Sequence, residues 1–153
     1  MKKNKTILAI WNSGGKGKSS SVRGFADALK STYLPPVRVD VFQNPNPFVN
    51  GQDFRYVVDI NGVRIGIESQ GDPNTNLRSR LDELSGGLYD CDIIVCSTRT
   101  RGETIDAVWH VVRKGYEPIW TSTYDVRDAV NHNLVNTLKG KHLLELLVTL
   151  GLI

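Results

Sequence analysis

The feature that most constrains the fold lies at the start of the chain, where a buried strand, a glycine-rich turn and an amphipathic helix follow one another. Residues 6–11 (TILAIW) are almost wholly apolar, which is typical of a strand covered on both faces of a sheet. From Ser19 the apolar residues recur at the spacing of one helix face, at Val22, Phe25, Ala26 and Leu29. A strand that leads through a glycine turn into a helix is a typical opening unit of an α/β domain.

The rest of the chain continues this alternation. Asn61-Gly62 is a strong hairpin signal between two apolar runs. We expect strands at 37–42, 54–60, 63–68, 92–97 and 118–121, and helices at 75–84, 105–112 and 126–150, the last with or without a break at Gly140. Residues 43–52, rich in Pro, Asn and Gly, are predicted to form a long functional loop. Strands that alternate with helices predict a mostly parallel sheet with helices on both faces and one antiparallel hairpin strand.

Length and composition indicate one domain that spans residues 1–153. The chain has 153 residues, of which 40% are hydrophobic, and its net charge of +3 is too small to indicate a nucleic-acid binder. The N-terminal apolar run is shorter than a signal-peptide core or a membrane span, so we expect a cytoplasmic protein without a membrane partner. Cys91 and Cys96 have neither disulfide nor zinc-site spacing, and we interpret them as reduced, buried thiols.

The segment Asn12-Ser13-Gly14-Gly15-Lys16-Gly17-Lys18-Ser19 lies between the first strand and the first helix. Its glycines allow successive N–H groups to converge on phosphate oxygens, and the helix N-terminus adds partial positive charge. The segment resembles the Walker A motif of the P-loop nucleoside triphosphatases, which implies their three-layer α/β fold with ATP or another nucleoside triphosphate and Mg²⁺ as ligands. The resemblance implies that Lys18 contacts the β and γ phosphates and that Ser19 binds Mg²⁺. The implied nucleotide-binding residues are Asn12, Ser13, Gly14, Gly15, Lys16, Gly17, Lys18, Ser19 and Ser20.

The segment departs from the family pattern at Asn12, which occupies the place of the first glycine. Asn adopts left-handed backbone more readily than other non-glycine residues, so a phosphate site stays feasible. Lys16 contacts either the γ phosphate, a partner's site or solvent. The alternative to a phosphate site is a glycine-rich turn whose lysines are simply solvated.

A P-loop protein needs an acidic group on a neighbouring strand to hold Mg²⁺ directly or through water. Glu68 is our choice because it ends a predicted buried strand and is followed by Gly71, similar to the D-x-x-G of GTPase-like members. We expect Glu68 to contact the metal through water or to act as a general base, with Asp72 able to share that work. The alternative for Glu68 is capping of the next helix, and Asp92, at the start of its strand, is a weaker candidate.

The loop after the strand at 92–97 carries Arg99 and Arg101. We expect Arg99 to neutralise phosphate charge as a catalytic residue, the alternative being a solvated loop. No N-K-x-D motif occurs there, so the sequence does not indicate guanine specificity. Thr121–Asp125 follows the last strand, where P-loop proteins often contact the base or ribose.

Three functions are compatible with these features. The first is Mg²⁺-dependent binding of ATP with hydrolysis or γ-phosphoryl transfer, as in an NTPase or a small kinase whose acceptor site is walled by 43–53 and 71–80. The second is a regulatory module that senses the nucleotide with little turnover. The third, nucleic-acid binding through the basic N-terminus and residues 99–101, is the least favoured. The Leu-rich C-terminal segment is expected to dock on the sheet or on another copy in a homo-oligomer.

Overall fold

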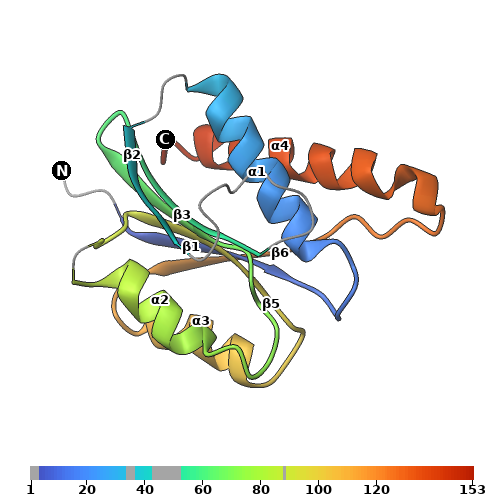
Figure 1. The fold of residues 1–153 in the computed structure, drawn as a ribbon. Helices are drawn as coiled ribbons and strands as arrows, with labels where there is room; N and C mark the ends of the chain where they lie inside the picture. The colour runs from blue at the N-terminus through green and yellow to red at the C-terminus, as the bar shows by residue number, and fades with distance from the viewer. Residues whose placement is uncertain (1–3, 34–36, 43–52, 88) are drawn as a thin grey trace.

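A computed structural model describes residues 4–33, 53–87 and 89–153, together with the backbone course of 37–42 (Figure 1). The elements are β1 (Thr6–Trp11), α1 (Lys18–Thr32), β2 (Val37–Phe42), β3 (Arg55–Ile60), β4 (Val63–Glu68), α2 (Leu77–Ser85), β5 (Ile93–Thr98), α3 (Glu103–Val112), β6 (Glu117–Ser122), a 3₁₀ turn (Ala129–Asn131) and α4 (His132–Thr149). The predicted α/β order is confirmed, with most element ends within two residues of the prediction, but the last helix begins at His132 and not at 126. The predicted functional loop at 43–52 lies outside the described residues.

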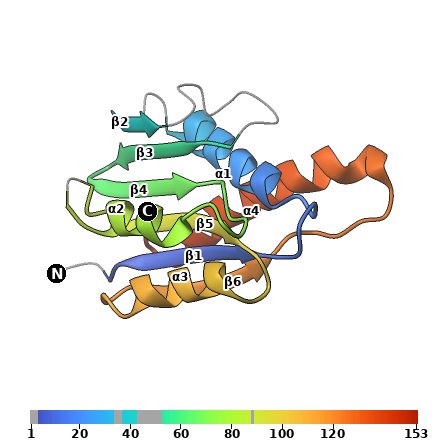
Figure 2. The same cartoon turned by 60° about the horizontal axis from the view of Figure 1, so that its bottom comes forward.

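The six strands form one sheet in the order β2-β3-β4-β5-β1-β6 (Figure 2). β1 runs parallel to β5 and β6, and β4 runs parallel to β5, whereas β3 is antiparallel to both of its neighbours. The turn between β3 and β4 has positive φ at Asn61 (51°) and at Gly62 (81°), which matches the right-handed twist of a hairpin. The mostly parallel sheet with one antiparallel hairpin strand is therefore confirmed.

Helices cover both faces of the sheet, α1 and α4 on one side and α2 and α3 on the other (Figure 1). β1 contributes Leu8 and Ile10 to the core under α1 and α4, and Ile7 and Ala9 to the core under α2 and α3. Burial on both faces explains why this strand is apolar throughout instead of alternating.

Helices α1 and α4 approach each other closely at two glycines. A Cβ on Gly140 would lie 2.2 Å from the carbonyl carbon of Gly24, so position 140 has no room for a side chain, and a Cβ on Gly24 would lie 3.0 Å from the backbone oxygen of Asn136. α4 continues through Gly140 without the break that the sequence left open. Gly140 allows the two helices to pack closely, and this packing keeps α4 continuous despite the low helix propensity of glycine.

The carboxyl ends of the parallel strands meet at one edge of the sheet. Trp11 at the end of β1 lies beside Thr98 of β5 and Ser122 of β6. Because β3 runs in the opposite direction, its first residue, Arg55, pairs with the last residue of β4, Glu68. The segments after β1, β4, β5 and β6, and the one before β3, therefore converge at this edge, where ligands of such sheets bind.

Two further expectations concern the cysteines and the membrane. Cys91 and Cys96 are free and buried, and burial raises the pKa of each thiol to about 12, so both are held as protonated thiols. Across the described part of the chain, none of the helices combines the length and the apolar character that crossing a membrane requires.

Candidate functional site

The glycine-rich loop, residues 12–17, joins β1 to α1 at the carboxyl edge of the sheet. Its backbone is left-handed at Gly15 (φ 72°) and at Gly17 (φ 80°). A Cβ on Gly17 would lie 2.5 Å from Oδ1 of Asn136 in α4, so a side chain there would be strained by its φ and would displace the Asn136 amide. Gly17 is also the N-cap of α1 and offers no side chain to the first-turn N–H groups of the helix. Such N–H groups bind anions.

Lys18, the first residue of α1, lies beneath the glycine-rich loop and is only 6% exposed. Its Nζ donates a hydrogen bond to the backbone carbonyl of Asn12, 2.8 Å away. Burial lowers the pKa of the ammonium, and the nearby positive charge of Arg99 lowers it further, while Asp72 acts in the opposite direction. Within the described residues no carboxylate forms an ion pair with Lys18. A nearly buried cation of this kind is suited to an anionic ligand.

Asn12 takes the place of the first glycine of the motif for a reason other than backbone freedom. It does not have a positive φ, contrary to the role we expected for it. Its side-chain amide nitrogen donates to Oγ1 of Thr123, 2.8 Å away, and its Oδ1 accepts from the backbone N–H of Ser13 at 2.7 Å. Asn12 therefore ties the glycine-rich loop to the segment after β6, which a glycine could not do.

Arg99, which the sequence analysis selected, lies against the glycine-rich loop. A Cβ on Gly14 would lie 2.7 Å from Nη1 and 2.7 Å from Nη2 of Arg99, which shows that the guanidinium covers the backbone at this point. Its Nε donates to Oδ1 of Asp72 at 3.0 Å, and its backbone N–H donates to Thr104 Oγ1 at 3.0 Å. Arg99 is thus held from two sides beside Lys18.

An acidic residue that the sequence analysis did not select meets Ser19. The Oγ of Ser19 lies 3.2 Å from Oδ1 of Asp53 and 3.2 Å from the backbone oxygen of Ser69. Ser69 Oγ also donates to Asp53 Oδ1 at 3.2 Å. Carboxylate, hydroxyl and carbonyl oxygens therefore meet at the first turn of α1. The Asn61-Gly62 hairpin could have predicted this position of Asp53, because its register places residue 53 beside the end of β4.

Glu68, our sequence-based choice for the metal and the general base, is not brought to Ser19. It faces α2, on the other side of the sheet from α1, because side chains alternate along β4. Its carboxylate is fully buried between two arginines, 3.1 Å from Arg55 Nε and 2.6 Å from Arg80 Nη1. Burial raises the pKa of the Glu68 carboxyl, and the two guanidinium groups oppose this shift. The geometry gives Glu68 a structural ion pair in place of the expected metal contact.

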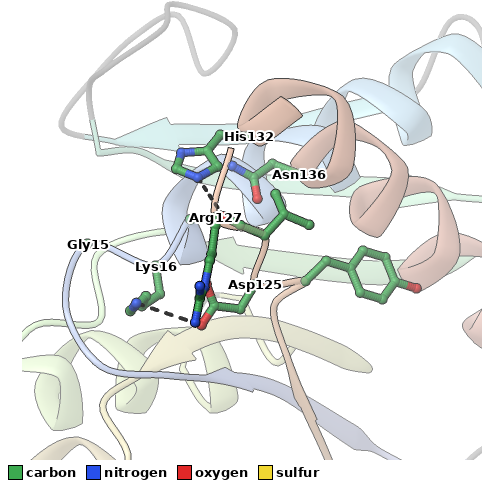
Figure 3. A pocket seen from close by; sticks show the side chains of 9 residues that line it. Gly15, Lys16, Asp125, Arg127, His132 and Asn136 are labelled. Atoms are coloured by element: carbon green, nitrogen blue, oxygen red, sulfur yellow. Dashed lines mark hydrogen bonds and ion pairs between the residues drawn. The ribbon is translucent and has the colours of Figure 1, made fainter. Parts of the chain in front are cut away.

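A polar hollow of about 440 Å³ opens between the glycine-rich loop and the start of α4 (Figure 3). Its lining residues are Gly15, Lys16, Gly17, Tyr124, Asp125, Val126, Arg127, His132 and Asn136. Lys16 reaches across it, with Nζ 3.7 Å from Oδ2 of Asp125, and is 44% exposed. The segment 121–125, which we expected to contact base or ribose, supplies two of the lining residues. The volume lies in the range of about 300–1,000 Å³ that is common for small-molecule sites.

Ser13 lies on the glycine-rich loop with an exposed side chain. The structure separates Ser20 from this site, because Ser20 lies on α1 and borders a different hollow, against α4. Arg101 is exposed beyond Arg99. The residues brought together are therefore the loop amides, Lys18, Ser19 and Arg99.

The site combines the N-terminus of a helix, the two neighbouring cations Lys18 and Arg99, the oxygen atoms that meet around Ser19, and an adjoining polar hollow. Comparisons with protein-family models, with curated proteins and with solved structures found no match to this chain. The geometry of the site itself is therefore the basis on which a function is assigned.

Proposed function

We propose that this chain binds ATP or a related nucleoside triphosphate together with Mg²⁺ and hydrolyses it or transfers its γ-phosphoryl group. The observation that carries the proposal is the nearly buried Lys18, held by the Asn12 carbonyl directly beneath a glycine-rich loop at a helix N-terminus. An ammonium in such surroundings is favoured by an anion with several acceptor oxygens. The arrangement agrees with the resemblance of residues 12–19 to a Walker A motif.

Each part of the nucleotide has a place in this proposal. The loop amides and Lys18 bind the β and γ phosphates, and Arg99 neutralises charge that develops on the transferred group. The hollow between Gly15 and Asn136 takes the nucleoside, with Asp125 and Arg127 as its hydrogen-bonding groups (Figure 3). Asp125 is not part of a guanine-reading motif, so ATP is our first choice of nucleotide.

The oxygens around Ser19 fit the preference of Mg²⁺ for hard oxygen ligands. We assign metal binding to Ser19 Oγ with the carboxylate of Asp53, in place of Glu68. Mg²⁺ supplies neutralisation of phosphate charge when bound. Changing Asp53 to Asn is expected to leave affinity for metal-free ATP unchanged and to reduce the gain in affinity on adding Mg²⁺ by about tenfold or more. An undiminished gain would contradict the assignment.

The second candidate, a nucleotide sensor with little turnover, is favoured by one observation. Glu68, the residue expected to serve as general base, is bound to Arg55 and Arg80. Phosphate release over time separates the two candidates. Turnover that disappears in Lys18→Met supports the enzyme, whereas tight binding without release supports the sensor.

Calorimetric titration with ATP and with GTP, each with and without Mg²⁺, tests the shared part of both candidates. We expect binding that Mg²⁺ strengthens and that Lys18→Met abolishes or weakens greatly. The matched control is Lys30→Met, which makes the same change at an exposed position of the same helix. Absence of binding by the wild-type protein would refute the proposal.

A further inference from the structure

Arg80 of α2 is buried close to the site, and its guanidinium lies within 3.0 Å of four oxygen atoms. Its residue surface is 7% exposed. Nη1 lies 2.6 Å from Glu68 Oε1, Nε donates to the Thr75 carbonyl at 3.0 Å, and Nη2 donates to the Gln70 carbonyl at 3.0 Å and to Thr75 Oγ1 at 2.8 Å. One guanidinium thus joins the end of β4 to both ends of the segment 69–76, which we call the β4–α2 loop.

The β4–α2 loop carries groups that contact the candidate site. The backbone oxygen of Ser69 lies 3.2 Å from Ser19 Oγ and accepts from Ser97 Oγ at 2.7 Å. Asp72 Oδ1 accepts from Arg99 Nε, and the backbone oxygen of Asp72 accepts from Thr75 Oγ1 at 2.6 Å. Thr75 is itself held by Arg80. A continuous set of contacts therefore runs from Arg80 through this loop to Arg99, which covers the glycine-rich loop.

Only arginine offers this combination of contacts. Its planar guanidinium presents five N–H donors in fixed directions, so it can bind a carboxylate and several carbonyls at once. Lysine would keep the positive charge beside Glu68 but could not span the same acceptors in one plane. Glu68 fixes the guanidinium from the sheet side, and Arg55 holds the other carboxylate oxygen of Glu68, 3.1 Å away.

We infer that Arg80, fixed by Glu68, is a positioning residue that sets the β4–α2 loop and, through Asp72, the place of Arg99 during turnover. This inference rests on the proposed function. It predicts an effect on kcat more than on KM. In the described part of the chain, Arg80 has no hydrogen bond or ion pair with the groups assigned to nucleotide binding, which are the glycine-rich loop and the adjoining hollow.

The test compares Arg80→Lys with the wild-type protein and with Arg78→Lys, an exposed arginine of the same helix that points to His110. We expect Arg80→Lys to lower kcat by about tenfold to a hundredfold, the scale of a misplacement near 1 Å, with KM for ATP changed by less than about threefold. Arg78→Lys should match the wild type. Glu68→Gln, which removes the anion that fixes Arg80, should change kcat in the same direction as Arg80→Lys.

Two further readouts separate positioning from a merely structural role. Arg80→Lys should have little further effect on kcat in an Asp72→Asn background, because both changes break the same set of contacts. Amide hydrogen exchange over residues 70–76, measured without nucleotide, should be faster in Arg80→Lys, while exchange in β1 and α1 stays as in the wild type.

Unchanged exchange over 70–76, or effects on kcat that add fully to those of Asp72→Asn, would overturn the positioning role. A lower kcat together with a higher KM for ATP, and faster amide exchange throughout the protein, would overturn it as well, since that result indicates general destabilisation. If the wild-type protein has no turnover, the enzymatic part of the proposed function has failed, and positioning in turnover fails with it. The exchange rates then still decide whether Arg80 orders the β4–α2 loop.

Discussion

Replacing Lys18 by Met should separate nucleotide binding from folding, because Met keeps the unbranched apolar stem and removes only the buried charge. In the absence of nucleotide the ammonium is held in the folded protein against its preference for water, as its lowered pKa indicates. The variant loses the 2.8 Å hydrogen bond to the Asn12 carbonyl but escapes this desolvation. We expect its free energy of unfolding without nucleotide to equal that of the wild type or to exceed it by about 1 kcal/mol.

With nucleotide the order should reverse. A hydrogen bond to a charged group contributes about 1.5–3 kcal/mol, which corresponds to a loss of affinity of about 10- to 150-fold on removing Lys18. At a nucleotide concentration of about 100 times Kd, binding stabilises the wild-type protein by about 2.7 kcal/mol. The variant should gain only about 0.3 to 1.4 kcal/mol at the same concentration.

Urea unfolding with and without Mg²⁺ and ATP measures both effects in one experiment. The pH dependence of the free energy of unfolding tests whether the charge of Lys18 destabilises the protein without nucleotide. A folded-state pKa below the ordinary value of 10.5 means that the charged form destabilises the folded protein at neutral pH; this penalty begins to fall as the pH rises through the lowered pKa and is gone above 10.5. The free energy of unfolding of the wild type should therefore gain from deprotonation of Lys18 at alkaline pH, and Lys18→Met should lack this gain. A variant that is less stable without nucleotide, yet equally stabilised by ATP, would show that Lys18 is structural and would refute this reasoning.

Three other predictions follow from buried or paired groups. Gly71→Ala should lower the free energy of unfolding by about 3 kcal/mol or more, measured in urea, because the new Cβ would lie 1.9 Å from a carbonyl oxygen of β5; a loss below about 1 kcal/mol would contradict the close approach. Cys91 and Cys96, whose pKa values are raised to about 12 by burial, should not react with iodoacetamide at pH 8 until the protein unfolds, and rapid labelling of the native protein would contradict their burial. The hydrogen bond from Lys114, and to a smaller extent that from His110, holds the pKa of Asp82 below its ordinary value, so ionised Asp82 stabilises the fold at neutral pH and this stabilisation is lost as the pH falls through the lowered pKa. Asp82→Asn should therefore reduce stability at pH 7 but not in acid. An equal effect at both pH values would be inconsistent with this.

The elements and the convergence of loops could be predicted because they depend on local signals. The apolar run of β1, the glycines at 14–17 and the Asn61-Gly62 turn each specify structure within a few residues. The parallel strands then bring their carboxyl ends to one edge. The positions of Lys18, Ser19 and Arg99 could be predicted because each follows a strand that ends at this edge, and the structure places all three there.

The partners of the carboxylates depend on tertiary structure, and the sequence analysis did not find them. Which helix covers which face of the sheet decides whether Glu68 meets α1 or α2, and strand alternation alone does not say so. The buried ion pair with Arg80 requires a helix nine residues long to return over the sheet in one particular orientation. Asn12 illustrates the same limit, since its amide is used for a bond to Thr123, more than a hundred residues away in the chain.

The antiparallel strand β3 explains how one hairpin supplies two acidic positions with different roles. Its amino end and the carboxyl end of β4 lie together, so Asp53 and Glu68 both arrive at the edge where the glycine-rich loop begins. Ser69 and Asp53 meet Ser19 on the α1 side, whereas Glu68 points to α2 and holds Arg80. The face of the sheet on which each carboxylate lies therefore decides whether it meets Ser19 or Arg80. In this protein that face assigns Asp53 to the proposed metal and Glu68 to the support of the β4–α2 loop.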